Sequence, residues 1–426
     1  MIQVDISNIW GQLSLPDLLE TEKDVSGAFD LLQAEEGRWQ VPDMEEELLC
    51  RMERAAEKIR GDSGVCVVLG SGSGCLGARA AVELLQGAQR NLLVGKGEPQ
   101  IFFAGDSLST RSWNRLMSLL EDRDFSIIAV SRTGTTLESA VAFRSLRWIL
   151  ERKYGTDRAN SRIYAVTGRE GSVLRQMAEE KGWEMFDIPD DRSGPYTVLT
   201  PAGLLPMAVA GIDVRRVLEG ARKTKEECGE HSLENPVWQY AAVRKLMLRD
   251  GKNVELLAAF EPDFAPFGAW WQALFAQSEG KDGTGLDPVP VRLTGNGCGL
   301  EQRIPEGRKN LFETMVRFDP PEQKHTIGAD WKDPDGLNYL EGRTLDRVEE
   351  QVYQGILTTH VDSGVPVITV ECGECREETL GGLFFFFQLS ASLSAYILGV
   401  NPYDNPAERL YRCDVEAVLG KPGNEA

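Results

Sequence analysis

The sequence predicts an α/β protein in which two parallel sheets are each covered by helices on both faces. Short apolar segments rich in β-branched residues alternate with longer amphipathic segments at intervals of roughly 25–35 residues. The second half of the chain repeats this alternation after a boundary near residues 205–230. A chain of 426 residues is also too long for one small core, so two or three domains are expected.

The first half contains four segments with the composition of buried parallel strands, and a helix follows each of them. The expected strands are Val65–Leu69, Ile101–Ala104, Ser126–Val130 and Ile163–Thr167. The expected helices are Met44–Arg60, Leu76–Gln86, one ending at Leu120, one ending at Tyr154, and Ser172–Lys181. In the helix that ends at Tyr154, the predicted buried face consists of Leu137, Ala140, Val141 and Trp148.

The second half follows the same pattern. Its expected strands are Val254–Ala258, Val289–Thr294, Asn310–Phe318 and Val365–Val370. Its expected helices are Met207–Ile212, Val214–Cys228, Asn235–Asp250, Phe267–Gln277 and Gly381–Leu398. Because polar residues interrupt the apolar block Leu383–Phe387 at Gln388 and Ser390, we expect a buried helix there and no membrane span.

Composition limits the partners and the compartment. Lys and Arg number 46 against 66 Asp and Glu, and this net charge of −20 disfavours nucleic acid and anionic membranes as partners. The N-terminus lacks the basic region and apolar core of a signal peptide, so a cytoplasmic protein is expected. Eight scattered cysteines favour free thiols. Cys372 and Cys375 form the one close pair. Two thiols at a strand end are favoured there over a redox pair or half of a metal site, and no metal or cofactor is expected.

One loop between an expected strand and an expected helix has the composition of a phosphate site. Its sequence from Ser131 to Thr136 is SRTGTT. The hydroxyls can donate hydrogen bonds, the glycine lets the backbone approach a ligand, and Arg132 adds a positive charge. The free N–H groups at the start of the helix point to the same place. The alternative is an ordinary Ser/Thr N-cap with Arg132 in solvent.

Two further loops are expected at the same edge of the sheet. Gly70–Gly74, with the sequence GSGSG, follows one strand, and Asp106–Ser107 follows the next. The glycine loop lacks the acidic residue of a dinucleotide-binding pattern. Ligands of parallel sheets bind beyond the carboxyl ends of the strands, so the convergence of these loops favours a phosphate site over a simple N-cap.

Eight segments distributed over essentially the whole chain carry a family resemblance in their order and spacing. They are Val67–Gly77, Ala129–Ala140, Ile188–Leu205, Gln272–Lys281, Glu306–Thr314, Asp335–Leu340, His360–Pro366 and Leu398–Pro402. Together with Leu419–Gly423 near the C-terminus, they resemble glucose-6-phosphate isomerase of the bacterial type.

The resemblance implies two sugar-isomerase (SIS) domains, each a parallel sheet between two layers of helices, in a homodimer with the site between the domains. The implied division is an N-terminal extension over 1–45, a first SIS domain over 46–210, a second over 211–405, and a C-terminal segment over 406–426 that reaches the active site. The implied ligand is a phosphorylated hexose, glucose 6-phosphate or fructose 6-phosphate. The residues implied to bind it are Gly72, Ser73, Gly74, Ser131, Arg132, Thr133 and Thr136, with Arg132 standing where the family has Lys.

The positions that perform the family's chemistry are mostly replaced. Aldose–ketose isomerisation moves a proton between neighbouring carbons and needs a carboxylate base, but this chain has Gln277 where the family has Glu. The ring-opening His of the family falls at Cys298, and the Arg that steadies the developing negative charge falls at Pro195. Lys421, a fourth residue of the family's site, is kept.

Two functions of different classes therefore remain open. One is an active glucose-6-phosphate isomerase with rearranged groups, in which Glu279 or Glu301 acts as the base. The other is a non-catalytic sugar-phosphate sensor or regulatory protein. We expect ordinary turnover to be weak or lost, because Glu279 lies two positions from Gln277 on a helix and points elsewhere. A third possibility, a different reaction that uses Cys298, is supported only by the presence of its thiol. His360 is expected to be structural or to lie at the dimer contact.

Overall fold

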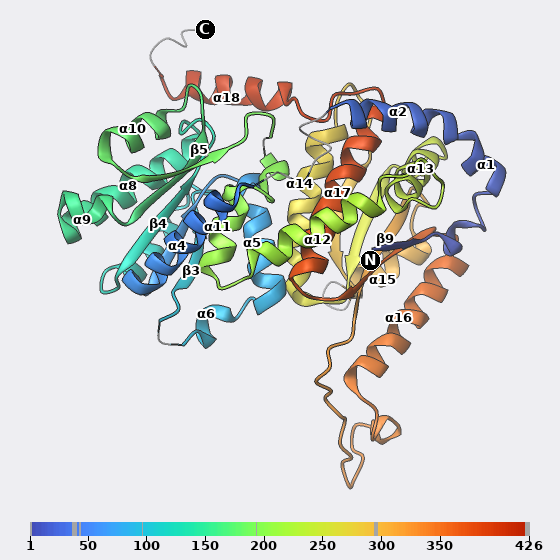
Figure 1. The fold of residues 1–426 in the computed structure, drawn as a ribbon. Helices are drawn as coiled ribbons and strands as arrows, with labels where there is room; N and C mark the ends of the chain where they lie inside the picture. Colours follow the sequence, from blue (N-terminus) through green and yellow to red (C-terminus); the bar gives the residue numbers. More distant parts are fainter. Residues whose placement is uncertain are drawn as a thin grey trace.

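The computed structural model describes residues 2–35, 41, 44–95, 97–192, 194–293 and 297–421, and the side chains of residues 73, 297 and 298 lie outside that description. Two five-stranded sheets lie side by side in the molecule, with helices packed around each of them (Figure 1). The expected α/β fold with two largely parallel sheets is therefore confirmed.

The first sheet consists of parallel strands in the order β3-β2-β4-β5-β6. Every residue of β2 and β4 is buried, because helices cover both faces of the central strands. Strands β2 to β5 lie within one residue of their expected bounds, whereas β6 was not expected because its sequence EMFDI mixes charged and apolar residues. The bounds are β2 Val65–Leu69, β3 Gln100–Ala104, β4 Phe125–Val130, β5 Ile163–Gly168 and β6 Glu184–Ile188.

The helices around this sheet include one whose buried face differs from the prediction. Val141 and Trp148 of α8 are 47% and 56% exposed, so their assignment to the sheet-facing side was wrong. The buried stripe contains Phe143, Leu146 and Leu150, and it also includes Ser139, whose polar side chain hides the apolar period in the sequence. The bounds are α4 Glu46–Asp62, α5 Ser73–Gln86, α6 Arg90–Leu93, α7 Thr110–Leu120, α8 Leu137–Tyr154, α9 Thr156–Asn160, α10 Val173–Lys181 and α11 Pro201–Val209.

The second sheet has the order β1-β10-β9-β7-β8, and only β1 runs antiparallel to its neighbour. Strand β1 comes from the N-terminal segment, which therefore contributes an edge strand to the second half of the molecule. The helix α2 of the same segment packs against α17. The bounds are β1 Gln3–Asp5, α1 Leu15–Glu20, α2 Glu22–Ala34, β7 Val254–Ala259, β8 Asp287–Arg292, β9 Leu311–Asp319 and β10 Val367–Glu374.

The core of the second half is built around α17, which is long and apolar enough to cross a bilayer. Because 89% of its apolar window is buried inside the protein, α17 is a core helix, as expected from the sequence. Residues 320–344, between β9 and α16, form an arm that projects from the molecule (Figure 1). The bounds are α12 Val214–Glu227, α13 Pro236–Arg249, α14 Ala265–Glu279, α15 Gly297–Glu306, α16 Leu345–Asp362, α17 Glu377–Ile397 and α18 Pro406–Val418.

A buried cluster of charged residues lies under the second sheet. The side chains of Arg244 on α13, Glu255 on β7 and Glu279 on α14 are fully buried, and Arg244 donates hydrogen bonds to both carboxylates. The Thr314 hydroxyl donates to Glu255 at 2.6 Å, and the Ser394 hydroxyl donates to Glu279 at 2.7 Å. Because removing one partner of such a cluster leaves charges buried without compensation, each member depends on the others.

We predict that Arg244→Leu lowers the free energy of unfolding by about 3–5 kcal/mol, since two carboxylates lose their shared cation in the core. Urea denaturation followed by circular dichroism measures the change. The control is Arg249→Leu on the same helix, which removes ion pairs from a side chain that is 43% exposed and should cost about 1 kcal/mol or less. Equal effects of the two substitutions would contradict the prediction.

Candidate functional site

Residues 131–136, called here the hydroxyl loop, connect β4 to α8. The side chain of Arg132 is exposed, while Ser131 and Thr133 are partly buried. The N–H of Gly134 donates to Ser131 Oγ at 3.0 Å, and the hydroxyls of Thr133 and Thr135 lie 2.9 Å apart. These short-range bonds fold the loop into a compact turn. The turn lies at the carboxyl end of β4, where parallel sheets bind ligands.

The N-cap position of α8 is occupied by Thr136, but its side chain makes no capping hydrogen bond. An ordinary Ser/Thr cap therefore does not explain this residue. The first N–H groups of an α-helix have no partner within the helix, and together they attract an anion. The Thr136 hydroxyl, these N–H groups and the exposed Arg132 guanidinium form a set of donors suited to a phosphate.

The loop that joins β5 to α10, residues 168–174, supports the hydroxyl loop from behind. The N–H groups of Gly168 and Val173 donate to the carbonyls of Arg132 and Thr133 at 3.2 and 2.9 Å. Gly134 has a φ of +75°, and a Cβ at that position would lie 2.5 Å from a backbone nitrogen at the start of α10. Glycine is therefore required there for both conformation and space. The sequence analysis did not identify this supporting loop.

The other two predicted loops meet the hydroxyl loop at the same edge of the sheet. The N–H of Gly70 donates to the carbonyl of Ala104 at 3.0 Å, which joins the ends of β2 and β3. A Cβ on Gly105 would lie 3.3 Å from Ser139 Cα and 3.4 Å from the Gly70 nitrogen. Gly72 is the N-cap residue of α5, with a φ of +51°. The predicted side-chain role of Ser73 lies outside the described residues.

A close contact between α5 and α14 joins this edge to the second half of the molecule. The two helices pack together. A Cβ on Gly77, one turn into α5, would lie 2.4 Å from Val198 Cγ2 and 3.4 Å from Trp270 Cδ1. The helix that begins at the glycine loop is thus pressed against Val198 and α14, and no larger side chain fits at Gly77 without a shift.

The same face of α14 holds the segment that contains Pro195. The indole N–H of Trp270 donates to the Pro195 carbonyl at 3.0 Å, and the hydroxyls of Tyr196 and Ser278 lie 2.8 Å apart. The 3-10 helix η2, Gly194–Thr197, therefore runs along α14, with the partly exposed Gln277 next to Ser278. Pro195 thus contacts α14 at Trp270, and Gln277 lies seven residues further along the same helix. Neither residue carries an ionisable group.

Of the two carboxylates considered as replacement bases, Glu279 is engaged in the core and Glu301 lies on another helix. Glu279 is buried in the cluster with Arg244, and Ser394 also donates to it. Its backbone is only two residues from Gln277, but its side chain faces the core on the other side of α14. Glu301 is exposed on α15. Glu279 is therefore a structural anchor.

The remaining two family positions lie on other elements. Cys298 is in the first turn of α15, but its side chain lies outside the described residues, so the expected role of its thiol stays a prediction. Lys421 follows α18, and its Nζ lies 2.8 Å from Glu416 Oε1. Helix α18 extends from the second half of the molecule toward the first (Figure 1). Lys421 is exposed and paired within its own segment.

His360 and Cys372 fit structural roles. His360 is buried, with Nδ1 at 2.6 Å from Glu313 Oε2. Cys372 is buried on β10, and burial raises the pKa of its thiol far above the usual value, which disfavours the reactive thiolate, whereas Cys375 is exposed. Across the part of the chain that the structure describes, no group of three or more His, Cys, Asp and Glu side chains is arranged to hold a metal ion.

Comparison with known proteins identifies the family. No protein-family model matches the chain. Glucose-6-phosphate isomerase of Bacillus cereus (strain AH187) is 42% identical over 384 residues, which cover 89% of this chain and 85% of the relative. Glucose-6-phosphate isomerase of Enterococcus faecalis (strain ATCC 700802 / V583) is 43% identical over 385 residues, which cover 89% and 86%.

Solved structures show the same fold. The crystal structure of a hypothetical protein from Thermus thermophilus superposes with a TM-score of 0.88 at 22% identity, covering 98% of this chain and 100% of that one. A glucose-6-phosphate isomerase from Chlamydia trachomatis gives a TM-score of 0.78 at 15% identity, covering 95% and 84%. With sequence identity above 40% over most of both chains and this shared fold, the chain belongs to the glucose-6-phosphate isomerase family.

Proposed function

We propose that this protein binds glucose 6-phosphate or fructose 6-phosphate and that its ordinary isomerase turnover is weak or lost. The proposal is carried by one contrast: the hydroxyl positions that bind phosphate in the family are kept in this chain, whereas positions that perform the chemistry are replaced. The anion-binding donors of the hydroxyl loop are present, whereas neither Gln277 nor Pro195 has an ionisable group. A non-catalytic role as a sugar-phosphate sensor or regulator accounts for both observations.

Binding is supported by the donors at the edge of the first sheet. A phosphate needs hydroxyls, backbone N–H groups and a positive charge close together. Ser131, Thr133 and Thr136 supply hydroxyls, the start of α8 supplies N–H groups, and Arg132 supplies the charge. Gly72 and Gly74 lie at the same edge, where the absence of a side chain at these two positions allows close approach. The chain carries a net charge of −20, so such a local positive group matters for attracting a phosphate.

The loss of turnover is supported by the groups near α14. An enediol intermediate forms only when a base removes a proton from carbon, and the amide of Gln277 cannot accept it. Glu279, the nearest carboxylate in sequence, is committed to Arg244 and Ser394. Moving it toward a substrate would leave Arg244 with one buried partner fewer, at a cost of several kcal/mol. Glu279 is thus a poor replacement base.

We also propose a cytoplasmic homodimer in which the arm contributes to the contact between subunits. The arm carries large apolar side chains far from the core: Trp331 is 87% exposed and Tyr339 is 68% exposed. Exposed aromatic side chains of this kind are typical of protein interfaces. The arm projects away from both sheets (Figure 1), so it can reach a second copy.

The binding proposal predicts that calorimetric titration detects glucose 6-phosphate binding and that Arg132→Ala weakens it by about tenfold, because a charge-assisted hydrogen bond is lost. Thr136→Val should weaken it in the same direction. The control is Arg144→Ala, which removes an exposed arginine from α8, the helix that follows the hydroxyl loop, and should leave the affinity unchanged. Unchanged affinity in both site variants would overturn the proposal.

For turnover, we expect no detectable uptake of solvent deuterium into fructose 6-phosphate by the unaltered protein, measured by mass spectrometry. Gln277→Glu alone should remain far below rates typical of the family, although a base contributes about 10²–10⁴-fold, because Pro195 and Cys298 are unchanged. Gln272→Glu, on an exposed face of α14, is the matched control. Ready deuterium uptake by the unaltered protein, or family-like rates in Gln277→Glu, would disprove the claim.

For assembly, sedimentation velocity should show a dimer, and Trp331→Ser should shift it toward the monomer because an exposed aromatic anchor is lost. Trp148→Ser removes a tryptophan that is 56% exposed on α8 and should leave the dimer intact. A monomer in the unaltered protein, or equal behaviour of the two variants, would rule out the arm as the contact.

A further inference from the structure

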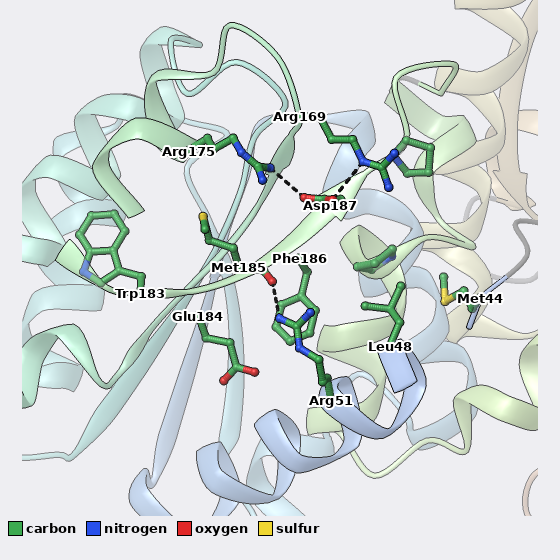
Figure 2. A pocket seen from close by; sticks show the side chains of 12 residues that line it. Met44, Leu48, Arg51, Arg169, Arg175, Trp183, Glu184, Met185, Phe186 and Asp187 are labelled. Carbon is green, nitrogen blue, oxygen red and sulfur yellow. Dashed lines mark hydrogen bonds and ion pairs between the residues drawn. The ribbon is translucent and has the colours of Figure 1, made fainter. Parts of the chain in front are cut away.

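A groove of about 470 Å³ lies along the edge strand β6, and none of the residues that line it belongs to α14 or η2. Figure 2 shows it between β6, the first turns of α4 and the start of α10. Its volume lies within the range of pockets that hold small organic ligands. Its apolar wall is formed by side chains from three segments: Met44, Leu48, Trp183, Met185, Phe186, Pro189 and Pro201.

Three guanidinium groups line the same groove. Arg169 and Arg175 hold Asp187 between them, with N–O distances of 3.0 and 2.8 Å (Figure 2). Arg51 donates to the Met185 carbonyl at 2.9 Å and lies over the Phe186 ring. Glu179 also pairs with Arg175, at 3.1 Å, so three carboxylates balance the three guanidinium groups and the groove carries no net positive charge.

These arginines retain hydrogen-bonding capacity. A guanidinium carries five N–H donors, and within the described residues the bonds to Asp187, Glu179 and the Met185 carbonyl use at most two of them on any one arginine. Asp187 is shared by two cations, and their hydrogen bonds outweigh the opposing effect of burial, so its pKa is lowered and it stays charged. The second lining carboxylate, Glu184, points away from Arg169 and Arg175 in Figure 2.

The groove is connected to the hydroxyl loop through the backbone. Arg169 directly follows Gly168, whose N–H donates to the Arg132 carbonyl. Arg175 follows Val173 by two residues, and the Val173 N–H donates to the Thr133 carbonyl. A Cβ on Gly168 would lie only 2.9 Å from the Arg132 oxygen, so the two loops are in tight contact. The backbone segment that carries both arginines is therefore held against the hydroxyl loop.

We propose that this groove is a second ligand site for a small organic phosphate with an apolar or aromatic body, and that its occupancy changes the affinity of the hydroxyl loop for its own ligand. The arginines bind the phosphate, and the apolar wall receives the body of the molecule. The groove alone supports the second ligand site. The change in the affinity of the hydroxyl loop also rests on the sugar-phosphate binding proposed above.

The test is calorimetric titration of the full chain with adenosine monophosphate as the probe and inorganic phosphate as the bare anion. We expect adenosine monophosphate to bind once per chain and more tightly than inorganic phosphate. The double variant Arg169→Gln/Arg175→Gln should weaken binding by about tenfold or more, and Leu48→Gln should also weaken it. Arg169→Gln alone should also weaken binding. This variant should fold normally, because the Arg169 side chain is 65% exposed.

Two controls locate the binding. Arg222→Gln, which removes an exposed arginine from α12, should leave the affinity unchanged. Arg132→Ala should leave the affinity for adenosine monophosphate within about twofold, because the groove and the hydroxyl loop are separate sites. The proposal is overturned if the probe does not bind, if inorganic phosphate binds equally well, or if Arg132→Ala abolishes binding while the double variant does not.

The coupling is tested by titrating glucose 6-phosphate with and without saturating adenosine monophosphate. We expect the affinity to change by about fivefold or more, with the same factor in the reverse experiment. Identical affinities would remove the coupling and leave the groove as an independent site. If glucose 6-phosphate does not bind at all, the proposed function and the coupling both fail, and the titration with adenosine monophosphate alone still decides whether the groove is a ligand site.

Discussion

The contact between α5 and α14 at Gly77 is the constraint on which the candidate site depends. Val198 and Trp270 lie so close to this glycine that any larger side chain would push the two helices apart. Helix α5 begins at the glycine loop of the first sheet, whereas α14 carries Gln277 and holds η2 through Trp270. Close packing at one position therefore fixes the distance between the carboxyl edge of the first sheet and α14, which carries one of the family's catalytic positions.

The buried charges behind α14 hold Glu279, the carboxylate nearest to Gln277 in the sequence, in a structural role. Glu279 satisfies Arg244, and Arg244 also compensates Glu255, whose pKa is raised by burial. The three residues stabilise one another, so a change that frees Glu279 weakens the core of the second half. Sequence distance is misleading here: two residues along a helix separate a solvent-facing position from the protein interior.

Much of the fold follows from local sequence pattern, and the exceptions have physical reasons. Strands β2 to β5 were predicted within one residue because central parallel strands are continuous apolar segments. Edge strands β1 and β6 and helix α16 were missed, since half-exposed elements mix charged and apolar residues. For the site, the hydroxyl loop was found from its composition. The backbone hydrogen bonds from Gly168 and Val173 that support this loop were not predicted, because such bonds between distant loops do not depend on particular residue types.

The groups proposed to bind the phosphate and the family's catalytic positions lie on different parts of this fold, so under the proposed function one can persist without the other. The donors for a phosphate come from backbone N–H groups and short hydroxyl side chains at the end of the first sheet. The groups that would move a proton belong to η2, α14 and α15. Contacts to the non-reacting phosphate hold the sugar equally well before and during reaction, so they do not depend on the catalytic groups. Under the proposed function, the replacements at Pro195 and Gln277 would remove stabilisation of the transition state and leave the phosphate contacts in place.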